Sequence, residues 1–285
     1  GTTGQMKNAT YSGIYDEPVT LADGVYEGEP FVEGGVARPV VTYIDNTLVY
    51  GGLDGGDLDG DGVDDAVALL VENSGGSGDF SYVGAQVDRD GLPSDAGAAL
   101  LGDRVQLISL AFADGQVVAE IVTQGPDEGL CCGTLKMRKT LALQDGQLAE
   151  IASEELGTVS LDDLMGTRWM LQRLNFDQPP LVDSTISADF TDGVVSGAGG
   201  CNNYSVAVTS EGGQLLTVGP IAATAMACGE ELDAQEADYL AALQAATGWW
   251  FFPGQLAVEY VTADGEQGAL FFNPAVSAEA GGTSQ

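Results

Sequence analysis

The chain has 285 residues, 44% of them hydrophobic, and its 43 Asp and Glu against 9 Lys and Arg give a formal net charge of −34. This length is sufficient for two domains with separate cores. A field of this sign repels nucleic acid and anionic membranes and favours cations. Histidine is absent, which excludes Ser-His-Asp and Cys-His nucleophile activation and the common zinc sites that contain histidine.

The acidic residues are spread over the whole chain. Residues 1–155 hold 27 acidic and 7 basic side chains, and the remainder holds 16 and 2. This distribution indicates solubility or adaptation to salt, with a surface suited to a basic partner as the alternative. No apolar run reaches the ~18 residues that span a bilayer. The chain opens with Gly1-Thr2-Thr3 and no initiator Met, so we expect a processed or trimmed protein.

Residues 6–155 are predicted to form an antiparallel β domain, because short runs of Val, Ile, Leu, Tyr and Phe recur between Gly, Asp and Asn. Asp114-Gly115 and Asp145-Gly146 predict tight hairpin turns, since Gly readily adopts positive φ. The predicted strands are Val19–Leu21, Val40–Ile44, Thr47–Gly51, Ala66–Glu72, Phe80–Asp88, Val105–Ala113, Gln116–Thr123, Thr134–Gln144 and Gln147–Ile151.

A calcium-like loop lies between two of these strands. Asp57, Asp59 and Asp61 alternate, Val63 can offer its backbone carbonyl, and Asp65 supplies a carboxylate at the ninth position. Hard oxygen ligands in that number suit Ca²⁺ better than Mg²⁺. The glutamate expected at the twelfth position of an EF-hand is missing, and the loop instead resembles the DxDxDGxxD hairpins of extracellular β proteins. We predict a structural calcium ion there, with a solvated Asp-Gly turn as the alternative.

Residues 160–273 are predicted to form a second β domain with one helix, after a short acidic join at Ala152–Leu161. The helix is expected over Glu230–Ala246, with Gly248 as its C-terminal cap. The tail, residues 274–285, is expected to be disordered. The predicted strands are Arg168–Asn175, Ile186–Phe190, Val194–Gly199, Asn203–Ser210, Gln214–Val218, Trp249–Phe252, Gln255–Val261 and Gly268–Phe272.

Four cysteines occur, as the adjacent pair Cys131-Cys132 and as Cys201 and Cys228. A bridge between Cys201 and Cys228 would contribute roughly 3–4 kcal/mol in the chain-entropy model and would imply an oxidising compartment. The alternative is a pair of buried reduced thiols. For Cys131-Cys132 we favour a bridge between neighbours, although reduced thiols or bonds elsewhere remain open.

Five segments of the second half carry a family resemblance: Gly166–Trp169, Gly197–Tyr204, Ile221–Cys228, Glu236–Leu243 and Leu270–Phe272. With these segments, the second half resembles the META domain family, which includes HslJ-type heat-shock proteins of the bacterial envelope. The resemblance implies a small barrel-like sheet with one packed helix and no established catalytic centre. It also implies a link to envelope stress, and many members are lipoproteins. Residues 6–155 are similar to the region that precedes the domain in some bacterial META lipoproteins.

The aromatic run Trp249–Phe252 cannot point wholly inward on a strand, because side chains alternate between faces. Part of it is therefore expected at the surface, where exposed aromatic side chains mark a contact site. Trp169 and Tyr204 are expected in the core, and Arg168 and Arg173, the only bases after residue 155, in ion pairs.

Together these features predict a non-enzymatic, extracytoplasmic envelope protein that binds a protein or a small apolar ligand. Membrane association is expected only through a lipid anchor, which we expect to have been lost on trimming. The first alternative is a hydrolase that acts on glycans with a carboxylate pair about 5–9.5 Å apart. The second is a purely structural spacer of the envelope.

Overall fold

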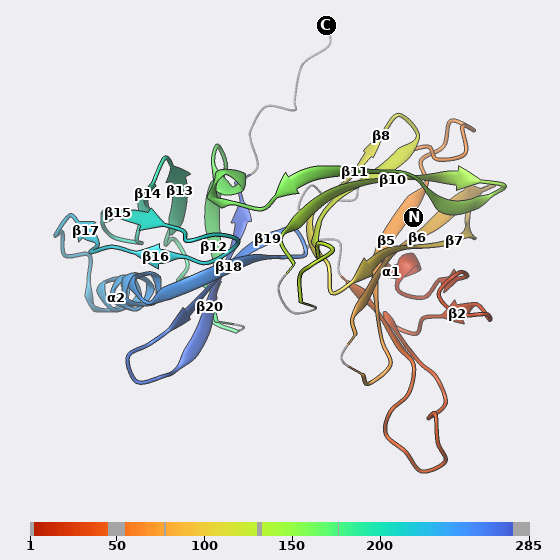
Figure 1. Ribbon diagram of the computed structural model, residues 1–285, viewed down its shortest axis with the longest axis horizontal. Coiled ribbons are helices and arrows are strands. Elements are labelled where there is room, and N and C mark those ends of the chain that lie inside the picture. Colours follow the sequence, from red (N-terminus) through yellow and green to blue (C-terminus); the bar gives the residue numbers. More distant parts are fainter. Residues whose placement is uncertain (1–2, 45–54, 77, 130–132, 176, 276–285) are drawn as a thin grey trace, which may run out of the picture. The chain divides into compact units, whose positions relative to one another are not determined.

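The computed structural model describes residues 3–44, 55–76, 78–129, 133–175 and 177–275 (Figure 1). The chain divides into two compact units, Gly1–Thr158 and Val159–Gln285. Strands account for 54% of the described residues and helices for 9%, which confirms the predicted mainly β fold. In the described part, no helix is both long and apolar enough to cross a membrane.

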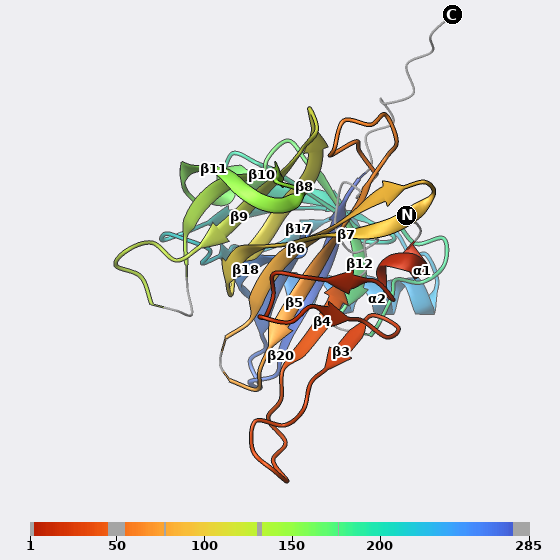
Figure 2. The same ribbon diagram turned by 90° about the vertical axis from the view of Figure 1, so that its right-hand side faces the viewer.

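The first unit contains two antiparallel sheets and a small two-stranded one (Figure 2). The five-stranded sheet has the order β3-β4-β5-β6-β7, and the four-stranded sheet has the order β11-β10-β9-β8. The elements are α1 (Thr3–Met6), β1 (Thr10–Tyr11), β2 (Val19–Thr20), β3 (Val25–Glu27), β4 (Val40–Ile44), β5 (Ala66–Asn73), β6 (Phe80–Arg89), β7 (Leu92–Asp103), β8 (Gln106–Ala113), β9 (Gln116–Thr123), β10 (Leu135–Gln144) and β11 (Gln147–Thr158).

The two larger sheets share an apolar core. Val83 on β6, Ile121 on β9 and Leu141 on β10 belong to one buried cluster, and each is fully buried. The other face of the five-stranded sheet holds a second cluster, in which Leu70 of β5 packs with Tyr11. The central strand β5 is thus buried on both faces, which explains its nearly continuous apolar sequence.

Both predicted hairpin turns are present. Ala113 pairs with Gln116 and Gln144 with Gln147, each across two residues. The Asp and Gly of each turn have φ between 51° and 81°, as a two-residue turn between twisted strands requires.

Strand β7 was not predicted. It is an edge strand that begins Leu92-Pro93 and contains Gly97 with φ of 83°, so its composition indicates a loop although the backbone is paired with β6. The predicted join at Ala152–Leu161 is also wrong in part, because β11 continues to Thr158. Pairing with β10 holds these acidic residues, including Glu154 opposite Arg138. The predicted strand Thr47–Gly51 lies outside the described residues.

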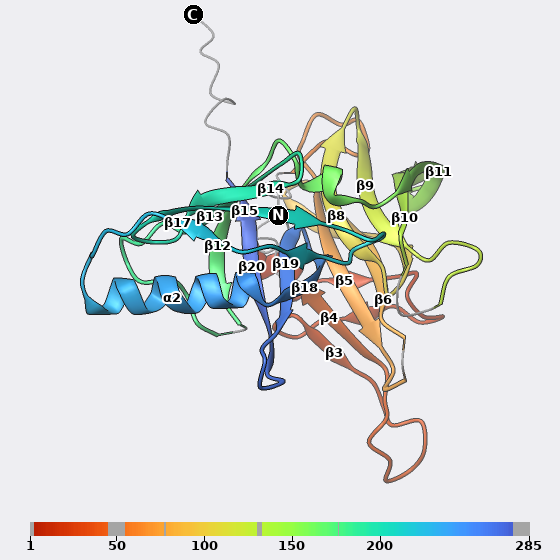
Figure 3. The same ribbon diagram turned by 60° about the vertical axis from the view of Figure 1, so that its left-hand side comes forward.

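The second unit is a nearly closed, barrel-like sheet with one packed helix (Figure 3). Its strand order is β16-β15-β14-β13-β12-β20-β19-β18, and β17 also pairs with β15. Hydrogen bonds from Leu216 N to Thr247 O (3.0 Å) and from Trp249 N to Gln214 O (3.0 Å) join the two ends. The elements are η1 (Leu161–Leu164), β12 (Arg168–Leu174), β13 (Ser187–Thr191), β14 (Val194–Ala198), β15 (Asn203–Thr209), β16 (Thr217–Val218), β17 (Ala222–Ala223), α2 (Glu230–Gln244), β18 (Ala246–Phe252), β19 (Gln255–Val261) and β20 (Gln267–Pro274).

The helix is shorter than predicted, and Gly248 does not cap it. Helix α2 ends at Gln244, with Ala245 as its C-cap, and Gly248 lies inside β18. A side chain at Gly248 would come within 2.6 Å of Glu259 Oε1, so close packing accounts for this glycine. Pro274, expected in the tail, is the last residue of β20. Residues 276–285 lie outside the described part.

Candidate functional site

The aspartate loop sits immediately before β5. A bridge between Gly56 and Asp65 closes its base. Inside it, the Asp57 carboxylate accepts N–H bonds from Gly60 (2.6 Å), Asp61 (3.1 Å) and Gly62 (2.9 Å). The loop backbone therefore folds around the Asp57 carboxylate, as the backbone of a turn does around an Asp side chain. Gly60 and Gly62 have φ of 81° and 87°, a conformation that favours glycine.

Three carboxylates converge in this loop. Asp57, Asp59 and Asp61 each offer an oxygen, and these oxygens lie within 4.8 Å of one another. Asp57 is half-buried and the other two are exposed. Three negative groups at this separation repel one another, and a hard cation between them would relieve that repulsion. The loop thus has the donor chemistry that Ca²⁺ prefers.

The prediction also names Asp65 and the backbone carbonyl of Val63 as ligands. Asp65 is 1% exposed and is not one of the three residues whose carboxylate oxygens all lie within 4.8 Å of one another. Its oxygens accept N–H bonds from Leu58 (2.7 Å) and from Asp88 on β6 (2.8 Å). Burial raises the pKa of Asp65. Asp65 therefore fixes the loop to the sheet. Val63 donates its N–H to Asp61 Oδ1 (2.7 Å), and its side chain is exposed.

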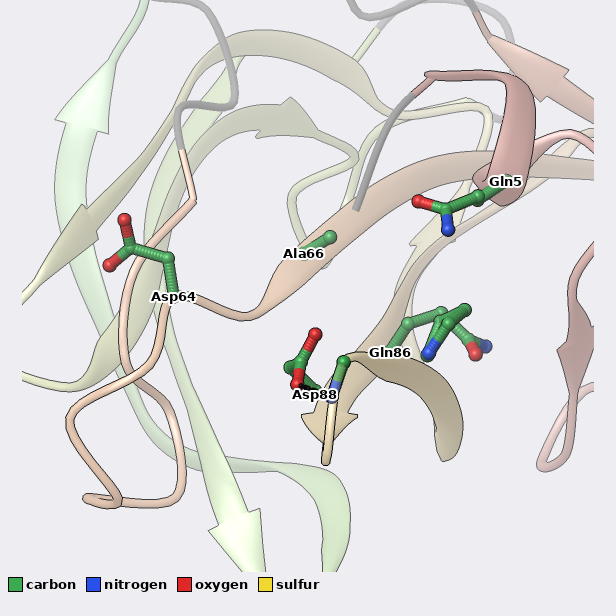
Figure 4. Close-up of a pocket in the computed structure, with 7 residues that line it drawn as sticks. Gln5, Asp64, Ala66, Gln86 and Asp88 are labelled. Atoms are coloured by element: carbon green, nitrogen blue, oxygen red, sulfur yellow. Dashed lines mark hydrogen bonds between the residues drawn. The ribbon is translucent and has the colours of Figure 1, made fainter.

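A hollow of about 370 Å³ adjoins the aspartate loop (Figure 4). Asp64 lines it from the loop, and Gln86 and Asp88 line it from β6. Gln86 donates to Thr10 O (2.7 Å), and Asp88 accepts from Gly91 N (2.7 Å). Asp64 is exposed and Asp88 half-buried, so neither is enclosed as the acid of a glycosidase pair would be.

In the second unit, Cys201 and Cys228 form a disulfide with their Cα atoms 5.9 Å apart, as the sequence predicts. The bridge ties the turn after β14 to the segment that leads into α2. The pair Cys131-Cys132 lies outside the described residues.

Asn202 holds the same two segments together through its side-chain amide. Its Nδ2 donates to Met226 O (3.1 Å) and to Glu236 Oε2 (2.7 Å). Its Oδ1 accepts from Thr224 Oγ1 (2.8 Å) and Met226 N (2.7 Å). All four bonding positions of the amide are used, which gives a physical reason for asparagine beside the bridging cysteine.

Glu236 anchors this turn to the helix. It is 8% exposed, and its Oε1 accepts N–H bonds from Asn202 (2.6 Å) and Cys201 (3.3 Å). A side chain at Gly199 would lie 2.6 Å from that oxygen, and one at Gly197 would collide with the Ser187 carbonyl. Sequence reasoning missed the role of Glu236, although a glutamate among apolar helix positions was the available signal.

Behind this turn, Tyr204 on β15 meets Tyr239 on α2. Their hydroxyls are 2.7 Å apart, and Tyr204 donates to Ser187 O (2.9 Å). Burial raises the pKa of both phenols. The pair is therefore a neutral hydrogen-bonded link between helix and sheet.

The aromatic run of β18 divides between two faces, as predicted. Trp249 and Phe251 are buried, whereas Trp250 is half-buried and Phe252 is 38% exposed. Trp250 lines a hollow of about 450 Å³ with Tyr260, Glu259 and Ala269. The Tyr260 ring lies over Gly268, where a side chain would collide with it. This hollow combines two aromatic rings with one carboxylate.

The predicted ion pair of Arg168 is present, with Nε 3.0 Å from Asp189 Oδ1. Arg173 donates to Gln255 Oε1 (3.1 Å) and stacks on Phe271, with Cζ 4.5 Å from the ring centroid.

The geometry of the second unit defines a class: a small, nearly closed antiparallel sheet, held by one helix and one disulfide. The sequence model of the META domain family matches residues 162–274, and the second unit therefore contains a META domain. No curated protein and no solved structure matches the chain.

Proposed function

We propose that this chain is a non-enzymatic, extracytoplasmic envelope protein that binds a small apolar ligand or a protein segment through its META domain. The hollow beside Trp250 is the observation that carries the proposal. A calcium ion in the aspartate loop stabilises the first unit. The envelope stress response is the cellular process that the family resemblance suggests for it.

The disulfide supports an extracytoplasmic location. Such bridges persist in oxidising compartments and are rare in reducing ones. The strongly acidic composition makes direct binding to anionic lipid unfavourable, so we propose that a lipid anchor provides the membrane attachment.

The Trp250 hollow suits an apolar group. Trp250 and Tyr260 supply flat apolar surface, and Glu259 supplies one polar contact at the edge. Pockets for small molecules commonly combine aromatic walls with a few polar groups. Because of the charge of −34, a neutral or cationic ligand is favoured over an anionic one.

Binding without a reaction is supported by two observations. The sequence contains no histidine, and the two carboxylates that line the hollow beside the aspartate loop are accessible to solvent. The chain therefore has no histidine to act as a general acid or base, and the two carboxylates lack the enclosed environment that tunes a carboxyl group for that role.

The ligand proposal is tested with the neutral fluorescent probe N-phenyl-1-naphthylamine. We expect probe emission to rise on binding to the wild-type protein. Trp250→Ser should lower the affinity for the probe by at least about fivefold, because it removes one of the two aromatic rings that line the hollow. Val182→Ser is the matched control, since Val182 is 91% exposed elsewhere. Equal titrations for all three proteins would overturn the proposal.

A further inference from the structure

The segment after β17 forms an exposed edge of the META sheet. Thr224 N donates to Asn203 O (3.0 Å), and Met226 N donates to Asn202 Oδ1 (2.7 Å). Asn202 Nδ2 in turn donates to Met226 O (3.1 Å). The side-chain amide of Asn202 therefore takes the place of a backbone peptide and continues the pairing of β17 with β15 as far as Met226.

The alternate residues of this segment present their backbone groups on the opposite side. Because successive residues of an extended strand point their N–H and C=O groups to opposite edges, Ala223, Ala225 and Ala227 face away from β15. All three are exposed, and no hydrogen bond within the described part of the chain involves the backbone of Ala225 or Ala227. The disulfide at Cys228 fixes the end of the segment.

This edge lacks the usual protection against strand pairing. Natural edges carry charges that discourage addition of another strand, as β11 does with Glu150 and Glu154, paired to Lys139 and Arg138. Residues 219–229 contain no charged side chain, although the protein is otherwise rich in acids. Figure 3 shows this segment running from β17 to α2 at the margin of the unit.

Charge decides the kind of strand that fits. After Arg173 the sequence contains 14 Asp and Glu and no Lys or Arg, and Glu230 and Glu231 are exposed at the end of the edge. A second copy of this acidic chain would be repelled, whereas an extended segment with lysine or arginine side chains would be attracted.

We infer that residues 222–227 accept an extended, basic segment of a partner protein as an additional strand. Backbone bonds from Ala223, Ala225 and Ala227 hold it, and the surrounding carboxylates select its charge. The disulfide and Asn202 fix the edge in advance, which lowers the ordering cost of binding. The inference specifies the partner class of the proposed binding function, and the edge does not include residues that line the Trp250 hollow.

The test uses the wild-type oxidised protein and a short synthetic peptide that alternates lysine with valine. Hydrogen exchange followed by NMR is expected to slow at the Ala225 and Ala227 amides when the peptide binds. The same peptide with alternate amides N-methylated keeps its charge but cannot pair, and a glutamate-valine peptide reverses the charge. Equal effects of the lysine peptide and its N-methylated form would overturn the inference.

Ala225→Pro removes one outward N–H and is expected to weaken peptide binding by about tenfold or more. Ala263→Pro is the matched control, because Ala263 occupies the second position of the Thr262–Gly265 turn, where proline is favoured. Unchanged binding by a folded Ala225→Pro protein would contradict the inference, as would pairing of two copies in sedimentation at high salt. If the wild-type protein binds the lysine-valine peptide but does not bind N-phenyl-1-naphthylamine, only the proposed ligand site beside Trp250 is rejected.

Discussion

Two side chains, Asn202 and Glu236, explain why the Gly-Gly-Cys-Asn sequence adopts its turn. The amide uses all its bonding capacity, on Thr224 and Met226 of the opposing segment and on Glu236 of the helix, and the Glu236 carboxylate accepts N–H bonds from the turn. A buried polar network of this kind is stable only when every member is satisfied. The cost of losing one member is therefore large.

Replacing Asn202 by Ala should lower the free energy of unfolding by about 3 kcal/mol, because Met226 N and Glu236 lose a buried partner. Asn203→Ala, at an exposed neighbouring position, should change it by less than about 0.5 kcal/mol. Urea denaturation measures both values. Similar values for the two variants would contradict the role given to Asn202.

The tyrosine pair predicts the response to alkaline pH. The pKa of Tyr239 is raised, chiefly by burial, so its contribution to stability is complete below the unfolded pKa of about 10 and decreases as pH rises toward the folded value. Above pH 10, each such tyrosine should cost about 1.4 kcal/mol per pH unit. Tyr239→Phe should therefore lose stability less steeply than the wild type between pH 10 and 11 in denaturant titrations. If the free energy of unfolding fell equally steeply with pH in the wild type and in Tyr239→Phe, the role given to Tyr239 would be contradicted.

At the scale of elements, the sequence predicts those whose side chains or turns decide their structure. The Asp-Gly turns, the alternating strands and the start of α2 at Glu230 are examples. It does not predict β7, where backbone pairing outweighs an unfavourable composition. It also misplaces Gly248, because a glycine that makes room for Glu259 looks the same as a helix cap.

In the candidate sites too, the sequence predicts local features and does not predict those that depend on tertiary packing. The spacing of the aspartates predicts the three that converge, because alternation along a curled loop is a local property. The bond from Asp88 N on β6 to the Asp65 carboxylate depends on tertiary packing, so the spacing alone does not predict it. The hollow beside Trp250 is formed by three strands, so only the exposure of the aromatic run could be predicted.

The aspartate loop predicts calcium binding that depends on individual carboxylates. Asp59→Asn should weaken Ca²⁺ binding by about tenfold or more, because a charged ligand is lost. Asp64→Asn removes the same charge from an exposed residue outside the converging group and should have much less effect. Isothermal titration calorimetry measures both. Equal weakening would show that only the overall negative charge attracts the ion.

In the whole protein, the two β units are stabilised by different means. The first has its core between two sheets and the aspartate loop at its surface. The second has the disulfide and the Asn202 network. Binding of a ligand to the folded state alone raises its stability, and a disulfide closing a loop of this length contributes about 3–4 kcal/mol in the chain-entropy model.

Differential scanning calorimetry in calcium or EGTA, with and without reductant, measures the stability of each unit. We expect calcium to raise the transition of the first unit and reduction to lower that of the second. The double variant Cys201→Ser/Cys228→Ser identifies the second transition. Two results would contradict these roles: a first-unit transition whose midpoint temperature calcium does not raise, or a second-unit transition whose midpoint temperature reduction does not lower.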